Sequence, residues 1–225
     1  MMTPYTSDKP VVLFDLDDTL YKEIDYLHSA YREISNYLNS DKHISDNPYP
    51  HMIEWYNRGE NVFYKLNAYY GLNIPIDYYL TLYRFHMPKI KMDASTEQTL
   101  SYIKERGCGM GIITDGRSIT QRNKILSLGL ERFFPMQNII ISDDIGSQKP
   151  DKRNFSIIQQ QFPEQHFIYV GDNIEKDFIT PNKLGWKTIC LLDDGRNIHK
   201  QDFSLPTDYL PHISVDRIDK IINYL

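Results

Sequence analysis

Residues 11–19, VVLFDLDDT, decide the fold of this chain. Four apolar residues, Val11 to Phe14, follow Pro10 and end directly at Asp15. A short, continuous apolar run of this kind is typical of a strand that is buried on both faces of a sheet. We therefore expect residues 11–14 to form a buried strand whose carboxyl end carries acidic side chains.

The segment from about Tyr21 to about Lys89 has a different pattern. Its apolar residues recur at spacings of three or four, which predicts amphipathic helices over residues 24–38, 52–66 and 77–86, the second broken near Gly59. The segment holds 12 of the chain's 17 tyrosines, most of which we interpret as packing residues. No strand is expected here, so residues 21–89 are interpreted as a helical insert.

The remainder of the chain alternates helices and strands. Helices are expected at about 94–106, 119–128, 152–162 and 174–183, and strands at about 109–113, 138–142, 166–170 and 188–192, before a closing helix at about 215–225. This alternation predicts an α/β fold with a doubly wound, mostly parallel, Rossmann-like sheet. Residues 1–20 and 90–225 would form the core, and residues 21–89 would be inserted after its first strand.

Composition excludes several classes of protein. A net charge of −5 gives no general attraction to nucleic-acid polymers or anionic membranes. No apolar stretch approaches the roughly 20 residues that cross a bilayer, and Met1 to Lys9 lack the pattern of a signal peptide. Cys108 and Cys190 lie in apolar surroundings and are expected to be reduced, although pairing is open. These features favour a cytoplasmic protein.

Polar residues follow four of the expected strands. The groups are Asp15 to Thr19, Thr114-Asp115-Gly116, Ser142 to Asp144 with Lys149 beyond, and Gly171-Asp172-Asn173 with Asp177 beyond. In a parallel sheet these groups meet at one edge, where ligands bind. Clustered carboxylates repel one another and usually need a cation, and oxygen ligands without histidine or cysteine favour Mg²⁺ over zinc.

Taken together and in order, these groups resemble the four motifs of the haloacid dehalogenase-like (HAD) hydrolase superfamily. Asp15-Leu16-Asp17-Asp18-Thr19 resembles the first motif, Thr114 the second, Lys149 the third, and Gly171-Asp172 with Asp177 the fourth. The helical insert falls where that family carries its first type of cap domain. Each match alone is weak, but four in order at strand ends form a specific pattern.

The resemblance implies a role for each residue, in agreement with its chemistry. Asp15 would be the nucleophile and Asp17 the general acid and base. Asp15 and Asp172 would hold Mg²⁺ through carboxylates, and Asp17 through its backbone carbonyl. The remaining residues bind phosphate or support the site. Thr114, Asp115, Gly116 and Lys149 would bind the phosphoryl group. Asn173 and Asp177 would orient the water molecules on the metal ion or the side chain of Lys149.

The expected function is hydrolysis of a small phosphorylated metabolite, a nucleotide or sugar phosphate, through an aspartyl-phosphate. A phosphomutase is the main alternative, and a non-catalytic phosphate-binding regulatory domain is a second. The resemblance implies that dehalogenases lack an acid at the position of Asp17, because halide leaves without a proton, so a dehalogenase is disfavoured. The sequence does not identify the substrate or the oligomeric state.

Overall fold

The core of the molecule is a six-stranded sheet in which all strands are parallel. The computed structural model describes residues 9–163 and 165–225, so the signal-peptide expectation for residues 1–8 lies outside them. The order across the sheet is β3-β2-β1-β4-β5-β6. The strands are β1 (Val11–Phe14), β2 (Gly109–Thr114), β3 (Ile139–Ile141), β4 (Phe167–Gly171), β5 (Lys187–Leu191) and β6 (Ile213–Val215).

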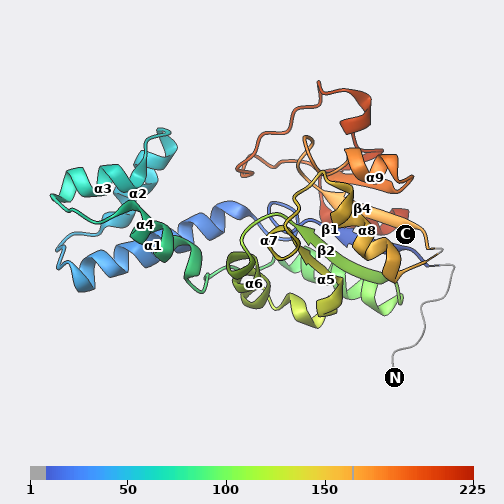
Figure 1. Cartoon of the computed structure of the whole chain (residues 1–225), viewed down its shortest axis with the longest axis horizontal. Coiled ribbons are helices and arrows are strands. Elements are labelled where there is room, and N and C mark those ends of the chain that lie inside the picture. Colours follow the sequence, from blue (N-terminus) through green and yellow to red (C-terminus); the bar gives the residue numbers. More distant parts are fainter. Residues whose placement is uncertain (1–8, 164) are drawn as a thin grey trace.

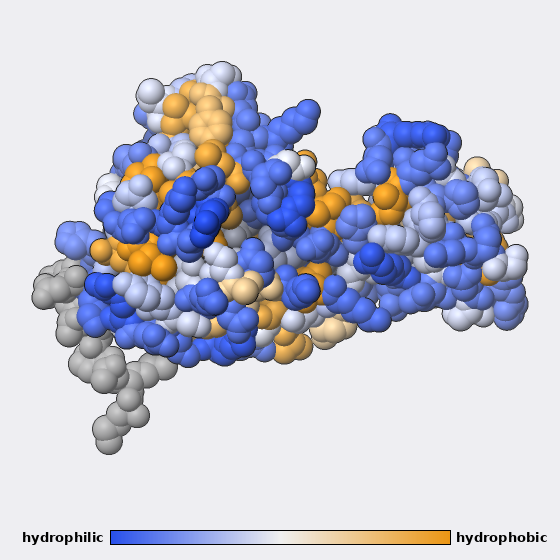
Figure 2. Space-filling model, turned by 180° about the vertical axis from the view of Figure 1, so that it is seen from behind, coloured by the Kyte–Doolittle hydropathy of each residue, from blue (hydrophilic) through white to orange (hydrophobic). Residues whose placement is uncertain are grey.

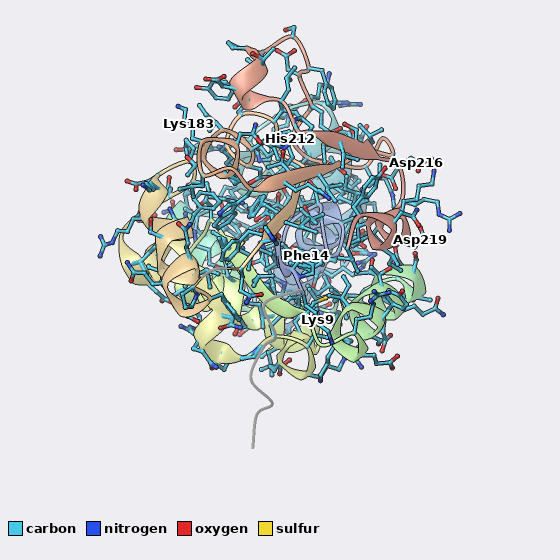
Figure 3. All side chains as sticks on the ribbon, turned by 90° about the vertical axis from the view of Figure 1, so that its right-hand side faces the viewer. Lys9, Phe14, Lys183, His212, Asp216 and Asp219 are labelled. Carbon is cyan, nitrogen blue, oxygen red and sulfur yellow. The ribbon has the colours of Figure 1, made fainter. Side chains whose placement is uncertain are left out.

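Strand β1 lies in the middle of this sheet and is buried, as its apolar sequence predicts. It pairs with β2 on one side and β4 on the other, and all four of its residues are buried. Val12 and Phe14 belong to one hydrophobic cluster, whereas Val11 and Leu13 belong to another. Because successive side chains of a strand point to opposite faces, this run of apolar residues fills both layers of the core. Figure 3 shows Phe14 in the middle of the packed side chains.

Helices cover both faces of the sheet, which makes the fold doubly wound as expected. Residues of α5 (Ala94–Glu105) and α6 (Ser118–Ser127) pack into the cluster of Phe14, and residues of α8 (Lys152–Gln161) pack into the cluster of Leu13. Short helices α7 (Ser142–Ile145) and α9 (Ile179–Lys183) follow β3 and β4. The space-filling view is mostly hydrophilic, with hydrophobic residues in small groups (Figure 2).

Residues 23–85 form four helices that project to one side of the sheet (Figure 1). They are α1 (Glu23–Asp41), α2 (Pro48–Asn57), α3 (Val62–Tyr70) and α4 (Ile76–Phe85). The helical conformation is interrupted between α2 and α3, around Gly59. Asn61 caps α3 by accepting a hydrogen bond from the Tyr64 backbone N–H. These helices bury their own hydrophobic cluster, which includes Leu38, Met52 and Tyr79.

Two expected helices are wrong, at least in part. The closing segment forms β6 and a 3-10 helix, Ile218–Tyr224, rather than one α-helix over 215–225. Its buried residues Ile218 and Ile221 are three apart, a spacing that a 3-10 helix satisfies as well as an α-helix does. The helix expected over 174–183 is present only from Ile179, because side chains of Asn173 and Asp177 bond the intervening backbone in turns.

Within the described residues, none of the helices combines the length and apolar character needed to span a membrane. Both cysteines are buried and unpaired, as the sequence analysis expects. The other expected strands and helices lie within a few residues of their expected ranges, whereas the sequence analysis does not predict α7, β6 or the short 3-10 helices.

Gly111 in β2 provides a test of how closely the layers pack. A Cβ atom there would lie 2.7 Å from the Asn138 carbonyl oxygen and 2.9 Å from Leu13 Cδ2. The carbonyl belongs to the backbone and cannot turn away, so we expect Gly111→Ala to lower the free energy of unfolding by about 1–3 kcal/mol. Urea denaturation measures this loss, and a neutral result would contradict the packing described.

Candidate active site

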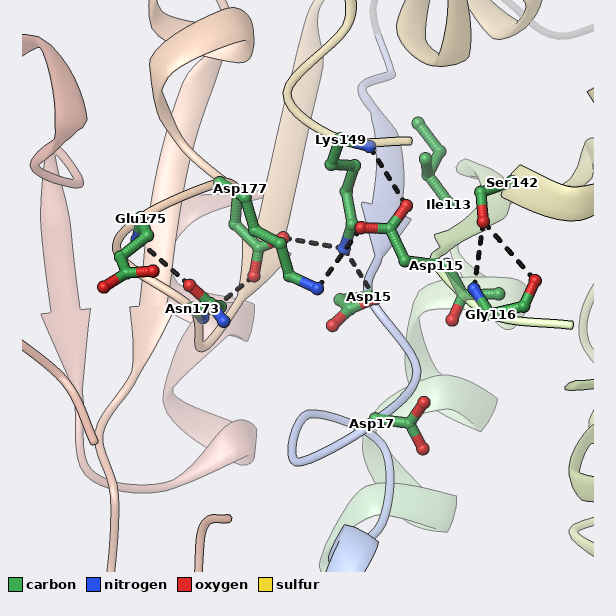
Figure 4. Close-up of polar contacts among 12 residues, drawn as sticks. Asp15, Asp17, Ile113, Asp115, Gly116, Ser142, Lys149, Asn173, Glu175 and Asp177 are labelled. Carbon is green, nitrogen blue, oxygen red and sulfur yellow. Dashed lines mark hydrogen bonds and ion pairs between the residues drawn. The ribbon is translucent and has the colours of Figure 1, made fainter. Parts of the chain in front are cut away.

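The polar groups predicted to converge do meet at the carboxyl ends of the strands (Figure 4). Asp15 follows β1, Thr114 ends β2, and Asp172 follows β4. A cavity of about 160 Å³ opens beside Asp15 and Asp172. Its lining consists of Asp15, Asp17, Asp18, Glu23, Asp115, Asp172, Asn173, Lys176 and His199.

Lys149 lies at the centre of the site between two carboxylates. Its Nζ is 2.7 Å from Asp15 Oδ1 and 2.7 Å from Asp177 Oδ1, and all three side chains are almost fully buried. Burial alone would lower the pKa of Lys149, but Asp15 and Asp177 raise it well above its usual value. Lys149 is therefore a fixed positive charge beside Asp15.

Burial raises the pKa of Asp15 to about 6, although Lys149 opposes this rise. The Asp15 backbone N–H donates to the carbonyl of Val170 in β4, which fixes the chain where it leaves β1. Of the two carboxylate oxygens of Asp15, only Oδ1 has a hydrogen-bonding or ionic partner among the described residues. Its Oδ2 therefore remains available to a ligand.

Asp177 supports the site from the segment after β4. Its Oδ2 accepts hydrogen bonds from the backbone N–H groups of Asp172 and Asn173, at 3.2 and 2.9 Å. A Cβ on Gly171 would lie only 2.5 Å from the same oxygen, so this close approach requires glycine. Both Asp177 oxygens are thus engaged by the protein.

The acidic cluster fits a hard divalent cation. Carboxylate oxygens of Asp15, Asp172 and Asp177 all lie within 4.8 Å of one another. Burial, together with Asp177 and Asp15, raises the pKa of Asp172 to about 9, which reflects the cost of its uncompensated charge. Because Asp177 already binds Lys149 and the backbone, Asp15 and Asp172 are the carboxylates best placed to hold the ion.

Asp172 is oriented by the loop that follows β5. The Asn197 side-chain amide donates to Asp172 Oδ2 at 3.0 Å, and Gln201 donates to its backbone carbonyl at 2.8 Å. The Thr19 hydroxyl is 3.5 Å from Asp172 Oδ1. One carboxylate oxygen of Asp172 is therefore only weakly bonded.

The Asp17 carboxylate points away from Asp15, toward α6 (Figure 4). Its Oδ1 accepts from Tyr21 and Lys124, at 2.5 and 2.7 Å, and its Oδ2 accepts from Gln121 at 2.9 Å. Burial would raise the pKa of Asp17, but Lys124 and the hydrogen bonds lower it overall.

The predicted phosphate-binding residues differ in their surroundings. Thr114 is buried and accepts a hydrogen bond from Gln121 at 2.6 Å. Asp115 lines the cavity, where Lys176 pairs with it at 3.2 Å and so offsets its charge. The Gly116 backbone N–H donates to the Ser142 hydroxyl, so its contact with phosphate stays a prediction.

Sequence reasoning missed several residues at the site. Gln121 and Lys124 lie three apart on α6, a spacing that places both on one helix face, but nothing local shows what they face. Lys176 directly precedes Asp177 and could have been noticed for that reason. Asn197 and His199 come from an irregular loop with no recognisable pattern.

The fold and site define a parallel α/β protein with a buried centre of carboxylates around one lysine. The family model for haloacid dehalogenase-like hydrolases matches residues 12–191. This match spans most of the chain and includes every element of the site from β1 to Asp177. The chain therefore belongs to the haloacid dehalogenase-like hydrolases.

Two curated relatives that match most of this chain have the same name. The glyceraldehyde 3-phosphate phosphatase of Methanocaldococcus jannaschii is 30% identical over 193 residues, covering 80% of this chain and 84% of that protein. The glyceraldehyde 3-phosphate phosphatase of Methanopyrus kandleri is 28% identical and covers 94% and 95%.

Solved structures share the fold. The HAD-hydrolase YfnB of Bacillus subtilis, crystallised with magnesium, superposes with a TM-score of 0.66 at 19% identity, covering 96% of this chain and 98% of that chain. A HAD phosphatase from Thermococcus onnurineus gives 0.61 at 20% identity, covering 96% and 97%.

The charge on Asp172 predicts an unusual dependence of stability on pH. In the unfolded chain this carboxyl ionises near its ordinary pKa of 3.8, whereas in the metal-free fold its pKa is about 9. Because the pKa of Asp172 is higher in the folded state, the folded protein has its full stability below pH 3.8, where this carboxyl is protonated in both states. The protein then loses stability as the pH rises toward 9. Asparagine carries no charge and removes this loss.

We therefore expect the free energy of unfolding of Asp172→Asn in EDTA at pH 8 to exceed that of the wild type by on the order of 2 kcal/mol. The difference should be smaller near pH 4. Mg²⁺ should stabilise the wild type but not the variant. Thermal unfolding at both pH values measures this. A variant less stable than the wild type at pH 8 in EDTA would contradict the charge cluster.

Proposed function

We propose that the protein is a Mg²⁺-dependent phosphatase that hydrolyses a small phosphate monoester through an aspartyl-phosphate on Asp15. The observation that carries the proposal is the arrangement of Asp15 between Lys149 and Asp172, in a cavity that Asp17 also lines. Such a site provides a nucleophile, a fixed cation and a proton-transfer group at once.

Sugar phosphates, and triose phosphates in particular, are the favoured substrate class. Support comes from the two relatives that match most of this chain and are named glyceraldehyde 3-phosphate phosphatases. A phosphoserine phosphatase of Thermus thermophilus matches a shorter part, 36% of this chain. The small cavity suits a small phosphorylated metabolite.

In the first half of the reaction, an oxygen of Asp15 attacks phosphorus. The bond from phosphorus to the leaving oxygen breaks, and Asp17 gives its proton to that oxygen. Lys149 offsets the negative charge on Asp15 and on the phosphoryl group. Lys176 lines the cavity, and Thr114 directly precedes Asp115, which also lines it, so both would bind phosphoryl oxygens.

In the second half, Asp17 takes a proton from a water molecule as the water attacks phosphorus. The acyl-phosphate bond breaks, inorganic phosphate leaves, and Asp15 is regenerated. A Mg²⁺ ion held by Asp15, Asp172 and the backbone carbonyl of Asp17 would supply charge neutralisation between the anionic nucleophile and the anionic substrate. Asn173 and Asp177 would keep these groups oriented.

Residues 21–89 would act as a cap on the core formed by residues 1–20 and 90–225. Helices α1–α4 have their own hydrophobic cluster, which allows them to move as a unit. Among the described cap residues, only Glu23 lines the cavity. Closure of the cap would bring further residues to the substrate and exclude water.

A cytoplasmic location completes the proposal and is supported by the two buried, unpaired cysteines. A non-catalytic phosphate-binding domain is disfavoured, because Asp15, Asp17, Lys149 and Asp172 are all present. Asp15, Asp17 and Asp172 line the cavity, and Lys149 pairs with Asp15.

The test is phosphate release from glyceraldehyde 3-phosphate, other sugar and nucleotide monophosphates, and p-nitrophenyl phosphate. We expect release that needs Mg²⁺, that EDTA abolishes, and that Asp15→Asn reduces by at least about 10³-fold, because the variant has lost its nucleophile. Sugar phosphates should be turned over faster than nucleotides.

The exposed variant Asp202→Asn is the matched control, because it makes the same chemical change in a carboxylate outside the cavity. Equal activity of Asp15→Asn and wild type would refute the proposal. Wild-type protein that binds Mg²⁺ but releases no phosphate from any compound would instead favour a phosphomutase, which returns the phosphoryl group to its sugar.

A further inference from the structure

Helix α6 presents two buried polar side chains to Asp17. Lys124 Nζ donates to Asp17 Oδ1 at 2.7 Å, and Gln121 Nε2 donates to Oδ2 at 2.9 Å. The two residues are three apart on the helix, and 1% of Gln121 and 3% of Lys124 are exposed. Both oxygens of one carboxylate are thus held from the same helix face.

Lys124 is placed with its charge out of water. Its Nζ is 3.8 Å from Glu23 Oε1 and lies 4.5 Å from the centre of the Tyr26 ring, so the cap and core both surround it. A buried lysine is costly unless it is paired, and Asp17 is its closest carboxylate. Neither the phosphate-binding residues nor the proposed metal ligand Asp172 contacts it.

Gln121 is fixed just as firmly. Its amide nitrogen donates to Asp17 and to the Thr114 hydroxyl, at 2.9 and 2.6 Å, which uses both of its hydrogens. A Cβ on Gly116 would lie 2.9 Å from the Gln121 side chain, so that backbone packs against it. Gln121 therefore joins Asp17 to Thr114 at the end of β2.

The direction of Asp17 suits work on the leaving oxygen. In phosphoryl transfer the attacking and leaving oxygens lie roughly in line on opposite sides of phosphorus, so an acid for the leaving oxygen need not face the nucleophile. Asp17 lines the same cavity as Asp15 but points away from it (Figure 4). Oδ1 receives two donors and Oδ2 only one, so Oδ2 keeps a second lone pair that can accept a proton and pass it on.

We propose that Gln121 and Lys124 are positioning residues that hold Asp17 where it passes its proton to the leaving oxygen. This inference rests on the proposed function, since it assumes that Asp17 is the general acid. The proton moves from Asp17 to the leaving oxygen as the phosphorus–oxygen bond breaks, and Asp17 recovers a proton from the water that attacks next. Neither Gln121 nor Lys124 gains or loses a proton.

The consequence is a dependence on the leaving group. A sugar alkoxide leaves only with a proton, whereas p-nitrophenolate is a stable anion and needs none. Loss of Lys124 should therefore lower kcat/KM for glyceraldehyde 3-phosphate by roughly 30-fold or more, but for p-nitrophenyl phosphate by no more than about threefold. A purely structural defect would lower both equally.

The experiment measures kcat/KM for both substrates in Lys124→Met and Gln121→Met. The glutamine variant leaves no buried charge unpaired, so it carries the test if Lys124→Met is poorly folded in a thermal melt. Arg122→Met is the matched control: Arg122 lies on the same helix and pairs with Asp144, but it does not contact Asp17. It should retain wild-type values for both substrates.

A double-mutant cycle with Asp17→Asn shows whether the effect passes through Asp17. We expect Lys124→Met to cause no further loss on glyceraldehyde 3-phosphate when Asp17 is already replaced. Equal losses on both substrates, additive losses in the cycle, or unchanged kcat/KM would each overturn the inference while Asp17→Asn still shows the leaving-group effect. If Asp17→Asn itself lacks that effect, the acid assignment fails and the inference with it. An active Asp15→Asn variant would refute the phosphatase mechanism separately.

Discussion

The ammonium of Lys149, held between the carboxylates of Asp15 and Asp177, is the interaction on which the site depends. It joins the end of β1, the loop before α8 and the segment after β4 at a point that is almost fully buried. Two buried carboxylates at this separation would repel each other without it. Removal of one partner would leave an uncompensated buried charge, so a single substitution among Asp15, Lys149 and Asp177 should be strongly destabilising.

The remaining negative charge supports the proposed metal ion, and polar side chains from the surrounding segments hold the carboxylates in place. One lysine does not neutralise Asp15, Asp177 and Asp172 together, and the raised pKa of Asp172 records the excess. Asn197 and Gln201 hold Asp172 from the loop after β5, while Gln121 and Lys124 hold Asp17 from α6. The two halves of the sheet thus orient separate groups around one small cavity.

The sequence predicts the parts of this structure that follow from local pattern. Apolar runs such as Val11 to Phe14 identify strands, and parallel pairing then brings Asp15, Thr114 and Asp172 together. Contacts of Lys124 and Asn197 depend on how distant segments pack, which one sequence does not reveal. The prediction of a closing α-helix is wrong because the spacing of Ile218 and Ile221, three residues apart, fits a 3-10 helix and an α-helix equally well.

The central claim is that Asp15 carries the phosphoryl group, and peptide mass spectrometry of acid-quenched enzyme tests it most directly. Asp17→Asn should accumulate the adduct from p-nitrophenyl phosphate and Mg²⁺, because that leaving group needs no acid whereas the attacking water needs a base. We predict one added phosphoryl group on the peptide that contains Asp15, and none after Asp15 is also replaced by asparagine. A phosphoryl group on another residue, or the same adduct without Asp15, would contradict the account.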